Sequence, residues 1–176
     1  ILSEFILLGI GGKELSEENA AQTAKALNII QPDFIRVHAT GIKLESKLGE
    51  FVRDGSFTLQ SEEEIVIEQK LFLQQLHEMD SYYVNEHIVN LLLEVRGNLR
   101  TEKQEMLSTI DRFLTLPPDE RLLFTVGRRL NIFFRLDDLK KPKLHQKAGE
   151  SLQQILSKNP HVDFAALCNY VRQSQI

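Results

Sequence analysis

Near the start of the chain, one short continuous apolar run is followed by an amphipathic stretch and then by a second segment with several apolar residues. Phe5–Leu8 is apolar at every position and is followed by a glycine-rich turn and by a helix that begins near Ser16. The segment Asp33–Thr40 predicts a second strand after that helix. A run that is apolar at successive positions is typical of a strand buried on both faces of a parallel sheet. The pattern therefore predicts a strand–helix–strand crossover, the repeating unit of α/β folds.

The ends of these two strands mark the expected functional site. Gly9, Gly11 and Gly12 form the turn after the first strand, and Arg36–Thr40 covers the end of the second. Ligands in folds of this kind bind at the carboxyl ends of parallel strands. We therefore expect any ligand-binding residues of this part of the chain to gather there.

The middle of the chain continues the alternation of helix and strand. Ser61 and Glu64 form a capping box. The helix that follows it has a buried stripe of Ile65, Phe72, Leu76 and Met79. Tyr82–Ile88 is rich in aromatic and β-branched residues and predicts a third strand. Asn85, Glu86 and Asn90 make the end of that strand polar, which suggests a role in positioning a substrate.

From Gly97 onward the signals are helical. Caps and apolar periodicity predict, in order, a turn at Gly97–Asn98, a capping box of Thr101 with Gln104, a helix capped by Asp119, a helix at about Lys143–Leu156, and a last helix capped by Asp163. We therefore expect an α/β fold. It would have two to three parallel strands with covering helices in residues 1–96, then a helical C-terminal region in residues 97–176.

Composition narrows the functional classes. The chain has 176 residues, a hydrophobic fraction of 42% and one cysteine, Cys168. A single cysteine excludes an internal disulfide, and it excludes a multi-thiolate zinc or iron–sulfur site made by this chain alone. No segment has the pattern of a membrane span or signal peptide, so we expect a cytoplasmic protein. Because the chain begins at Ile1 and enters a buried-type strand almost at once, we expect a fragment that lacks its N-terminal part.

Charge is unevenly distributed. Residues 1–127 carry 12 basic and 21 acidic residues, a net charge of −9, whereas residues 128–158 carry 8 basic and 3 acidic residues, a net charge of +5. The basic segment 128–147 invites a role in binding nucleic acid or another anion. No aromatic stacking pattern accompanies the charge, so we favour a solvated helix face over nucleic-acid binding.

Several quoted segments resemble a known enzyme family. FILLGIGGKELS followed by a helix and then DFIRVHAT resembles the second half of the barrel of radical S-adenosylmethionine (radical SAM) enzymes. The likeness is greatest to iron–sulfur oxidoreductases related to oxygen-independent coproporphyrinogen oxidases. KLGEFVRDGSFTLQSEEEIVIEQKLFLQQL and VNEHIVNLL are similar to the segment that follows the barrel in one branch. The likeness covers about residues 4–130.

The resemblance implies cofactor contacts at particular positions. In that family, the fifth barrel strand has the pattern Gly-x-Ile-x-Gly-x-x-Glu and lines the adenine side of S-adenosylmethionine. Gly9 matches the second glycine and Leu7 the apolar contact, whereas Phe5 replaces the first glycine and Gly12 stands where the glutamate would be. The next strand would supply backbone groups to the adenine. The cofactor-binding positions implied are Leu7, Gly9, Gly11, Gly12, Val37 and His38.

The family's three-cysteine motif is absent, because it belongs to a loop upstream of the region that this chain resembles. The resemblance therefore implies that the parent protein binds S-adenosylmethionine and a [4Fe–4S] cluster and is an oxidoreductase. This chain would be its C-terminal portion, would line part of the cofactor and substrate pocket, and would hold neither cofactor nor metal alone. Its partner would be the upstream half of the same protein.

Each marked residue also has a simpler interpretation. The Gly9–Lys13 turn lacks the spacing of a phosphate-binding loop, so its glycines could merely make a tight turn. His38 and His87 are candidate acid–base groups, but hydrogen-bonded histidines in a polar layer are more common. Cys168 has no sequence partner that would make it a nucleophile.

Two expectations concern function and assembly. The rival to the radical SAM interpretation is a non-catalytic helical interaction module, with nucleic acid as a candidate ligand of residues 128–147. A strand at Phe5–Leu8 without its neighbour would expose an apolar edge. We therefore expect self-association through that edge unless the C-terminal helices cover it.

Overall fold

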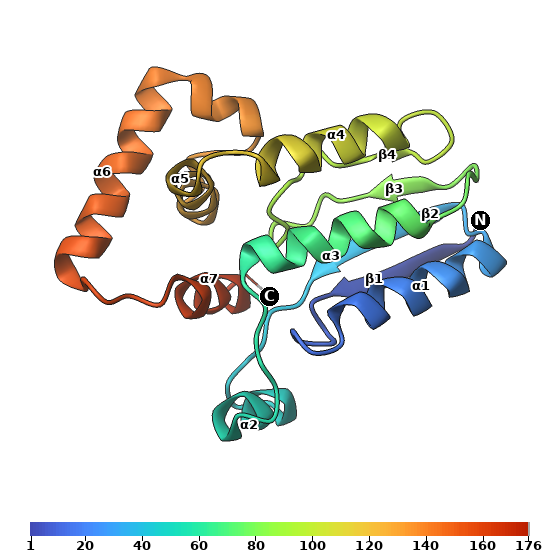
Figure 1. The fold of residues 1–176 in the computed structure, drawn as a ribbon, viewed down its shortest axis with the longest axis horizontal. Coiled ribbons are helices and arrows are strands. Elements are labelled where there is room, and N and C mark those ends of the chain that lie inside the picture. Colours follow the sequence, from blue (N-terminus) through green and yellow to red (C-terminus); the bar gives the residue numbers. More distant parts are fainter. Residues whose placement is uncertain (176) are drawn as a thin grey trace.

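A computed structural model describes residues 1–175 as a mixed α/β fold built on a small open sheet (Figure 1). The strands lie in the order β1-β2-β3-β4, with bounds β1 Ser3–Leu8, β2 Phe34–Ala39, β3 Tyr82–Val84 and β4 Gly97–Asn98. β1, β2 and β3 are parallel, and β4 pairs with β3 in the antiparallel direction. The predicted α/β class and parallel strands are confirmed, and the sheet does not close into a barrel.

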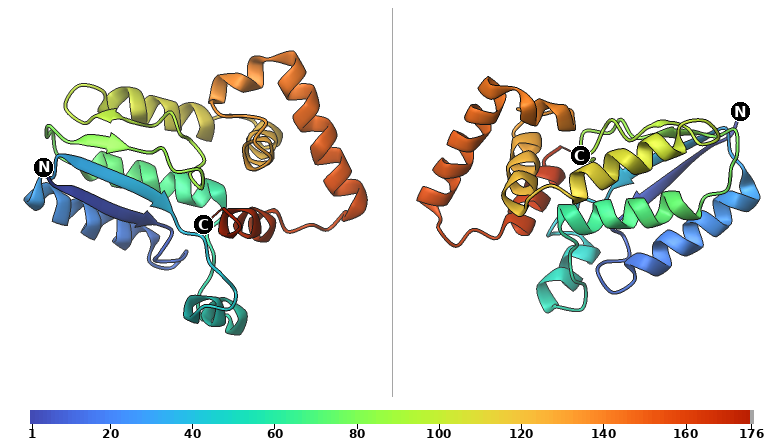
Figure 2. Two further views of the ribbon diagram at one scale, coloured as in Figure 1. Left: turned by 180° about the vertical axis from the view of Figure 1, so that it is seen from behind. Right: turned by 45° about the horizontal axis from the view of Figure 1, so that its top comes forward.

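The helices follow the strands in chain order. Their bounds are α1 Ser16–Ile30, α2 Lys47–Asp54, α3 Glu62–Gln75, α4 Lys103–Leu114, α5 Pro118–Arg129, α6 Pro142–Lys158 and α7 Phe164–Gln173, with a short 3-10 helix η1 at Leu136–Lys140. α1 and α3 pack against each other and α4 against α3, so these three form one helical layer. Figure 2 (left) shows the strands in front of this layer, with no helix on their other face.

The one-sided cover explains how β1 is buried. Ile6 and Leu8 point toward the helices and are buried, whereas Phe5 is 65% exposed and Leu7 48% exposed on the open face. Successive side chains of a strand point to opposite faces, so a helical layer on one side buries only every second residue. The prediction that Phe5–Leu8 is buried on both faces is therefore wrong for the chain as described.

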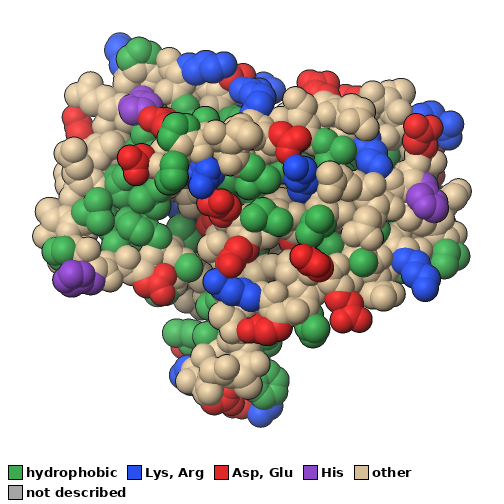
Figure 3. Space-filling model, in the orientation of Figure 1, with side chains coloured by type: hydrophobic (Ala, Val, Ile, Leu, Met, Phe, Trp, Pro, Cys, Tyr) green, Lys and Arg blue, Asp and Glu red, His purple; other side chains and the backbone are tan. Residues whose placement is uncertain are grey.

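The C-terminal helices lie at the carboxyl ends of the parallel strands (Figure 1). α7 is held there by Asn169, whose side chain accepts a hydrogen bond from the Ile42 amide at 3.2 Å and donates one to the Ile42 carbonyl at 3.3 Å. α2 projects from the body of the molecule as a separate lobe, as Figure 3 shows. The helical cover thus meets the sheet at the edge where α/β folds bind ligands, and leaves the open face uncovered.

Two of the predicted helix starts are confirmed in detail. Ser61 accepts a hydrogen bond from the Glu64 amide at 3.2 Å, and the Glu64 carboxylate accepts one from the Ser61 amide at 2.7 Å. Asp163 accepts hydrogen bonds from the amides of Ala165 and Ala166. Both residues satisfy amides that have no partner inside the helix.

Other boundaries differ from prediction. Ser16 is the first residue of α1 and not its cap, and the predicted box at Thr101 is wrong because α4 begins one residue after Glu102. Asp119 lies inside the first turn of α5, since Pro118 occupies the first helical position. The third strand ends at Val84 rather than Ile88, and Gly97–Asn98 pairs as β4 where only a turn was predicted.

Candidate functional site

The glycine turn after β1 is organised by a buried carboxylate on α3. Glu68 accepts hydrogen bonds from the Gly9 amide (3.1 Å), the Ser16 hydroxyl (3.0 Å), the Asn19 amide group (2.7 Å) and the Gln60 amide group (2.8 Å). Gly9 has a positive φ of 83°, which allows its N–H to turn inward toward this carboxylate. The turn at the carboxyl end of β1 is therefore fixed from inside the molecule.

This arrangement bears on the phosphate-loop interpretation. A carboxylate occupies the inner side of the turn, where a phosphate-binding loop would direct its amides at an anion. The Lys13 amide donates to the Thr58 carbonyl at 3.0 Å, and the Lys13 ammonium pairs with Glu64 at 2.9 Å. The turn thus has the wrong charge and the wrong donors for a phosphate loop.

His38 and His87 come together on the open face. Their rings stack with centroids 4.2 Å apart and planes 25° apart, and the rings of His38 and Phe5 form an edge-to-face pair with centroids 5.5 Å apart. Burial lowers the pKa of His38 below its ordinary value, and the nearby His87 and Arg36 lower it further. A pocket of about 230 Å³ borders the pair, and its lining includes Arg36 and Glu86.

Arg36 lies next to this pair in a distinct setting. Its Nε donates to the Ser3 hydroxyl at 3.0 Å, and its guanidinium lies 5.9 Å from the Phe5 ring centroid and 5.7 Å from that of Phe34. Within residues 1–175 no carboxylate forms an ion pair with it. The open face thus carries an aromatic and cationic wall that runs from the amino ends of β1 and β2, at Ser3 and Phe34, to the middle of both strands.

The remaining predicted positions are split between the two sides of the sheet. Leu7 faces the open side, whereas the Val37 side chain is buried under the helices and its carbonyl accepts a hydrogen bond from Asn90 at 2.6 Å. Asn90 also accepts from the Ala39 amide at 2.7 Å and donates to Asn85 at 2.5 Å. Asn90 and Asn85 therefore hold the end of β2 in place, a structural role at the expected site.

The basic segment is largely internal or paired. Arg128 and Arg129 are 1% and 4% exposed, so the interpretation of a solvated helix face is wrong for both. Arg129 donates two hydrogen bonds to the Glu62 carboxylate, at 2.9 and 2.6 Å. Lys140 and Lys141 each pair with an aspartate three residues earlier, at 2.7 Å. These four residues therefore do not supply a patch of free positive charge.

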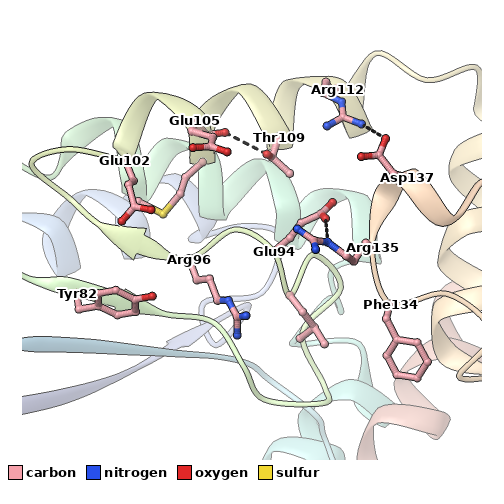
Figure 4. A pocket seen from close by; sticks show the side chains of 12 residues that line it. Tyr82, Glu94, Arg96, Glu102, Glu105, Thr109, Arg112, Phe134, Arg135 and Asp137 are labelled. Atoms are coloured by element: carbon pink, nitrogen blue, oxygen red, sulfur yellow. Dashed lines mark hydrogen bonds and ion pairs between the residues drawn. The ribbon is translucent and has the colours of Figure 1, made fainter.

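A larger pocket, of about 520 Å³, lies between β3, α4 and η1 (Figure 4). Arginines and carboxylates alternate along its wall and pair with each other: Arg135 with Glu94 at 3.2 Å and Arg112 with Asp137 at 2.7 Å. Because these charges are already paired, the pocket presents no concentrated charge of one sign to a ligand.

Metal ligands are lacking in the described part of the chain. No group of three or more His, Cys, Asp or Glu residues between positions 1 and 175 is placed to hold a metal ion. Cys168 is buried on α7, where burial and the nearby Glu62 raise the pKa of its thiol to about 12. Such a thiol has very little thiolate at neutral pH and is a poor nucleophile.

Sequence reasoning missed two buried carboxylates, Glu62 and Glu68. Glu68 had a readable signal, because it lies three residues after Ile65 and four before Phe72 on the apolar stripe of a predicted helix. A carboxylate at such a position needs several donors around it. Glu62 gave no comparable signal, since it falls in an acidic run at a helix start, where exposed carboxylates are common.

Comparison with protein-family models, with curated proteins and with solved structures finds no match to this chain. In the portion described, residues 1–175, no helix combines the length and the apolar character needed to cross a membrane.

Proposed function

We propose that this chain is the C-terminal portion of a radical SAM iron–sulfur oxidoreductase and forms part of the wall of its cofactor and substrate pocket. One observation carries the proposal: three parallel strands have helices on one face only, and the other face and the β1 edge are open. Parallel sheets are normally covered on both faces. An arc cut from a β/α barrel has this one-sided cover, because its inner face looks into the barrel.

The side chains on the open face are of the kinds expected on the inner wall of a barrel enzyme. His38 projects from it near the carboxyl end of β2, the end at which barrel enzymes place their active sites, and Phe5 and Arg36 lie next to each other at the middle of β1 and β2. In this proposal the face contacts the substrate or S-adenosylmethionine, and Leu7 and the Gly9–Gly12 turn line the adenine side. His38 and His87 are the groups placed to exchange a proton with a bound molecule.

The cluster itself must come from elsewhere in the parent protein. A [4Fe–4S] cluster takes three thiolates from a radical SAM protein. This chain offers one thiol, that of Cys168, which is buried on α7 and belongs to no group of three potential metal ligands within residues 1–175. The residues present do not fit the cluster, so no step of its chemistry is assigned to this chain. The chain's own contribution is to bind, orient and enclose.

The proposal is tested by comparing the chain alone with the chain joined to the residues upstream of Ile1 in its gene. We expect the chain alone to be colourless after anaerobic reconstitution and to produce no 5′-deoxyadenosine from S-adenosylmethionine under reducing conditions. The longer protein should bind iron and sulfide and cleave the cofactor. His38→Ala should impair turnover in the longer protein, whereas Glu45→Gln on the exposed loop before α2 should not.

Two results would overturn the proposal. One is an upstream sequence without a Cys-x-x-x-Cys-x-x-Cys motif, and the other is stoichiometric iron and sulfide bound by the chain alone. The rival function, a helical interaction module that binds nucleic acid through residues 128–147, has less support. Arg128 and Arg129 of that segment point inward, and Lys140 and Lys141 are paired.

A further inference from the structure

Three arginines surround one carboxylate inside the molecule. Arg128 and Arg172 are each 1% exposed, Arg129 is 4% exposed, and Glu62 is 5% exposed. They come from three helices: Glu62 from α3, Arg128 and Arg129 from α5, and Arg172 from α7. Burial alone would raise the pKa of Glu62, but Arg129, Arg172 and Arg128 together hold it below its ordinary value. The cluster therefore contains three positive charges and one negative charge.

The single carboxylate is used almost entirely by Arg129. Arg129 binds both of its oxygens, at 2.9 and 2.6 Å, and also donates to the Val89 carbonyl at 2.9 Å. Arg172 makes only an ion pair with Glu62, with its Nε 3.6 Å from Oε1. Arg128 donates to the Ile88 carbonyl at 3.0 Å and the Asn90 carbonyl at 3.3 Å and has no carboxylate of its own. Two guanidinium charges are thus left without a counter-charge.

Many guanidinium nitrogens in the cluster also lack an acceptor among residues 1–175. They are Nε and Nη1 of Arg128, Nη1 of Arg129, and Nε and Nη1 of Arg172. A guanidinium does not lose its proton in a protein, so it cannot escape the cost of burial by becoming neutral. A buried charge without a partner is strongly destabilising. A ligand that supplies negative charge and acceptor oxygens would therefore stabilise this arrangement.

The helices that carry the cluster are tied to the carboxyl end of β2. Asn90 links Arg128 to that strand, since its carbonyl accepts from Arg128 and its side chain accepts from the Ala39 amide. Asn169, one helical turn before Arg172, binds both backbone groups of Ile42. The helices that carry Arg128 and Arg172 are therefore attached at the edge where parallel sheets bind ligands.

We propose that this cluster, Arg128, Arg129 and Arg172, binds a dianionic tetrahedral oxyanion of the phosphate class. The charge decides the class: two unmatched guanidinium charges are neutralised by a dianion, whereas a monocarboxylate or chloride leaves one unmatched. Guanidinium forks also match the spacing of phosphate oxygens. Because the donors are enclosed, the small free ion fits better than the same group on a larger molecule. The proposal does not depend on radical SAM chemistry.

The test uses the whole chain, unfolded in urea and refolded in phosphate-free chloride buffer so that no ion is carried over. Thermal unfolding is then followed while inorganic phosphate replaces chloride at constant ionic strength. A specific ligand raises Tm in a saturable way, by roughly 5–10 °C at a hundredfold excess over its Kd. Sulfate should act like phosphate, and acetate should not.

Arg172→Met is the decisive variant, because Arg172 donates no hydrogen bond whose loss would prevent folding. Without phosphate, its Tm should equal or exceed that of the natural chain, since one uncompensated charge is gone. With phosphate, it should show at most a tenth of the natural affinity. Arg112→Met, which removes an exposed arginine on α4, should keep the full phosphate response.

Three outcomes would overturn the proposal. They are the absence of a saturable rise in the natural chain, a rise that survives Arg172→Met, and an equal rise with acetate. Glycerol phosphate serves as a separate arm. If glycerol phosphate raises Tm at a lower concentration than inorganic phosphate does, the site is supported and its ligand is a phosphoryl group on a larger molecule. If glycerol phosphate needs a higher concentration, the free ion is supported. Phosphate binding measured by equilibrium dialysis gives a stoichiometry of one without reference to stability.

Discussion

The carboxylate of Glu68 should be a main determinant of stability, and Glu68→Leu tests this. Leucine fills a similar volume but leaves four donors without their acceptor. Ser16 and Asn19 are half-buried and can turn toward water, whereas the Gly9 amide and the Gln60 side chain are buried and cannot. An unsatisfied buried donor costs about 1–3 kcal/mol. Two of them predict a loss of about 2–6 kcal/mol in the free energy of unfolding.

Removing the buried negative charge of Glu68 should by itself increase stability, but this gain is smaller than the loss from the unsatisfied donors. The four donors already offset most of the cost of burying the Glu68 carboxylate, so little is recovered when the charge is removed. Glu68→Gln should lose less than Glu68→Leu. Its oxygen can still accept from Gly9, and the Gln60 amide can turn, since its Oε1 has no present partner. The order of stability should be Glu, then Gln, then Leu.

Urea unfolding followed by circular dichroism measures the change, with Glu45→Gln as a control at an exposed site. The control should stay within about 0.5 kcal/mol of the natural chain. Hydrogen exchange supplies a local test, because the Gly9 amide should lose protection in Glu68→Leu before the sheet does. If Glu68→Leu unfolds within about 0.5 kcal/mol of the natural chain, the carboxylate does not organise the turn and our reasoning is wrong.

Three further predictions concern other parts of the molecule. The pKa of His38 is lowered by burial and by His87, so its titration followed by NMR should lie below 6.5. Above its unfolded pKa of about 6.5, neutral His38 should therefore add stability, and this stability should be lost as the pH falls through the folded pKa. His87→Phe should shift the His38 titration upward. An unchanged midpoint would contradict the assignment of part of the shift to His87. Gly127→Ala should cost about 1–3 kcal/mol, because its Cβ would overlap the Phe133 ring, and a stability equal to that of the natural chain would refute this contact. At tens of micromolar, the chain should form dimers or larger species, measured by light scattering. Phe5→Lys should shift this equilibrium toward the monomer. A monodisperse monomer of the natural chain would show that the open face does not drive association.

The parallel strands could be predicted because their signal is local. The runs at Phe5–Leu8 and Asp33–Thr40, with one helix between them, require a crossover, and the Ser61 capping box is contained within four residues. The one-sided cover could not be predicted in the same way. Alternating burial in β1 depends on where helices pack, and the apolar residues at Phe5 and Leu7 read as buried although no helix covers them.

In the candidate site, too, features with a local sequence signal could be predicted, and features that depend on distant contacts could not. The glycine turn lies at the carboxyl end of β1, as its sequence indicates, and His38 and His87 lie near the expected edge. Their stacking depends on a contact between residues 49 positions apart, which no short pattern encodes. The burial of Arg129 likewise depends on Glu62, 67 positions earlier, so a cluster of charges in the sequence was read as a solvated surface.

The residues that contact each other in the arginine cluster are synthesised several seconds apart. Glu62 and Arg172 are separated by 110 positions, and at about 5–20 residues per second their synthesis is separated by roughly 5–22 s. β1, β2, β3 and their helices can assemble in that interval, whereas the carboxyl edge closes only when α7 emerges. Folding during translation therefore has two stages for this chain. In such an intermediate the sheet would be formed and Glu62 would lack its contact with Arg172, so docking of α7 would complete the cluster.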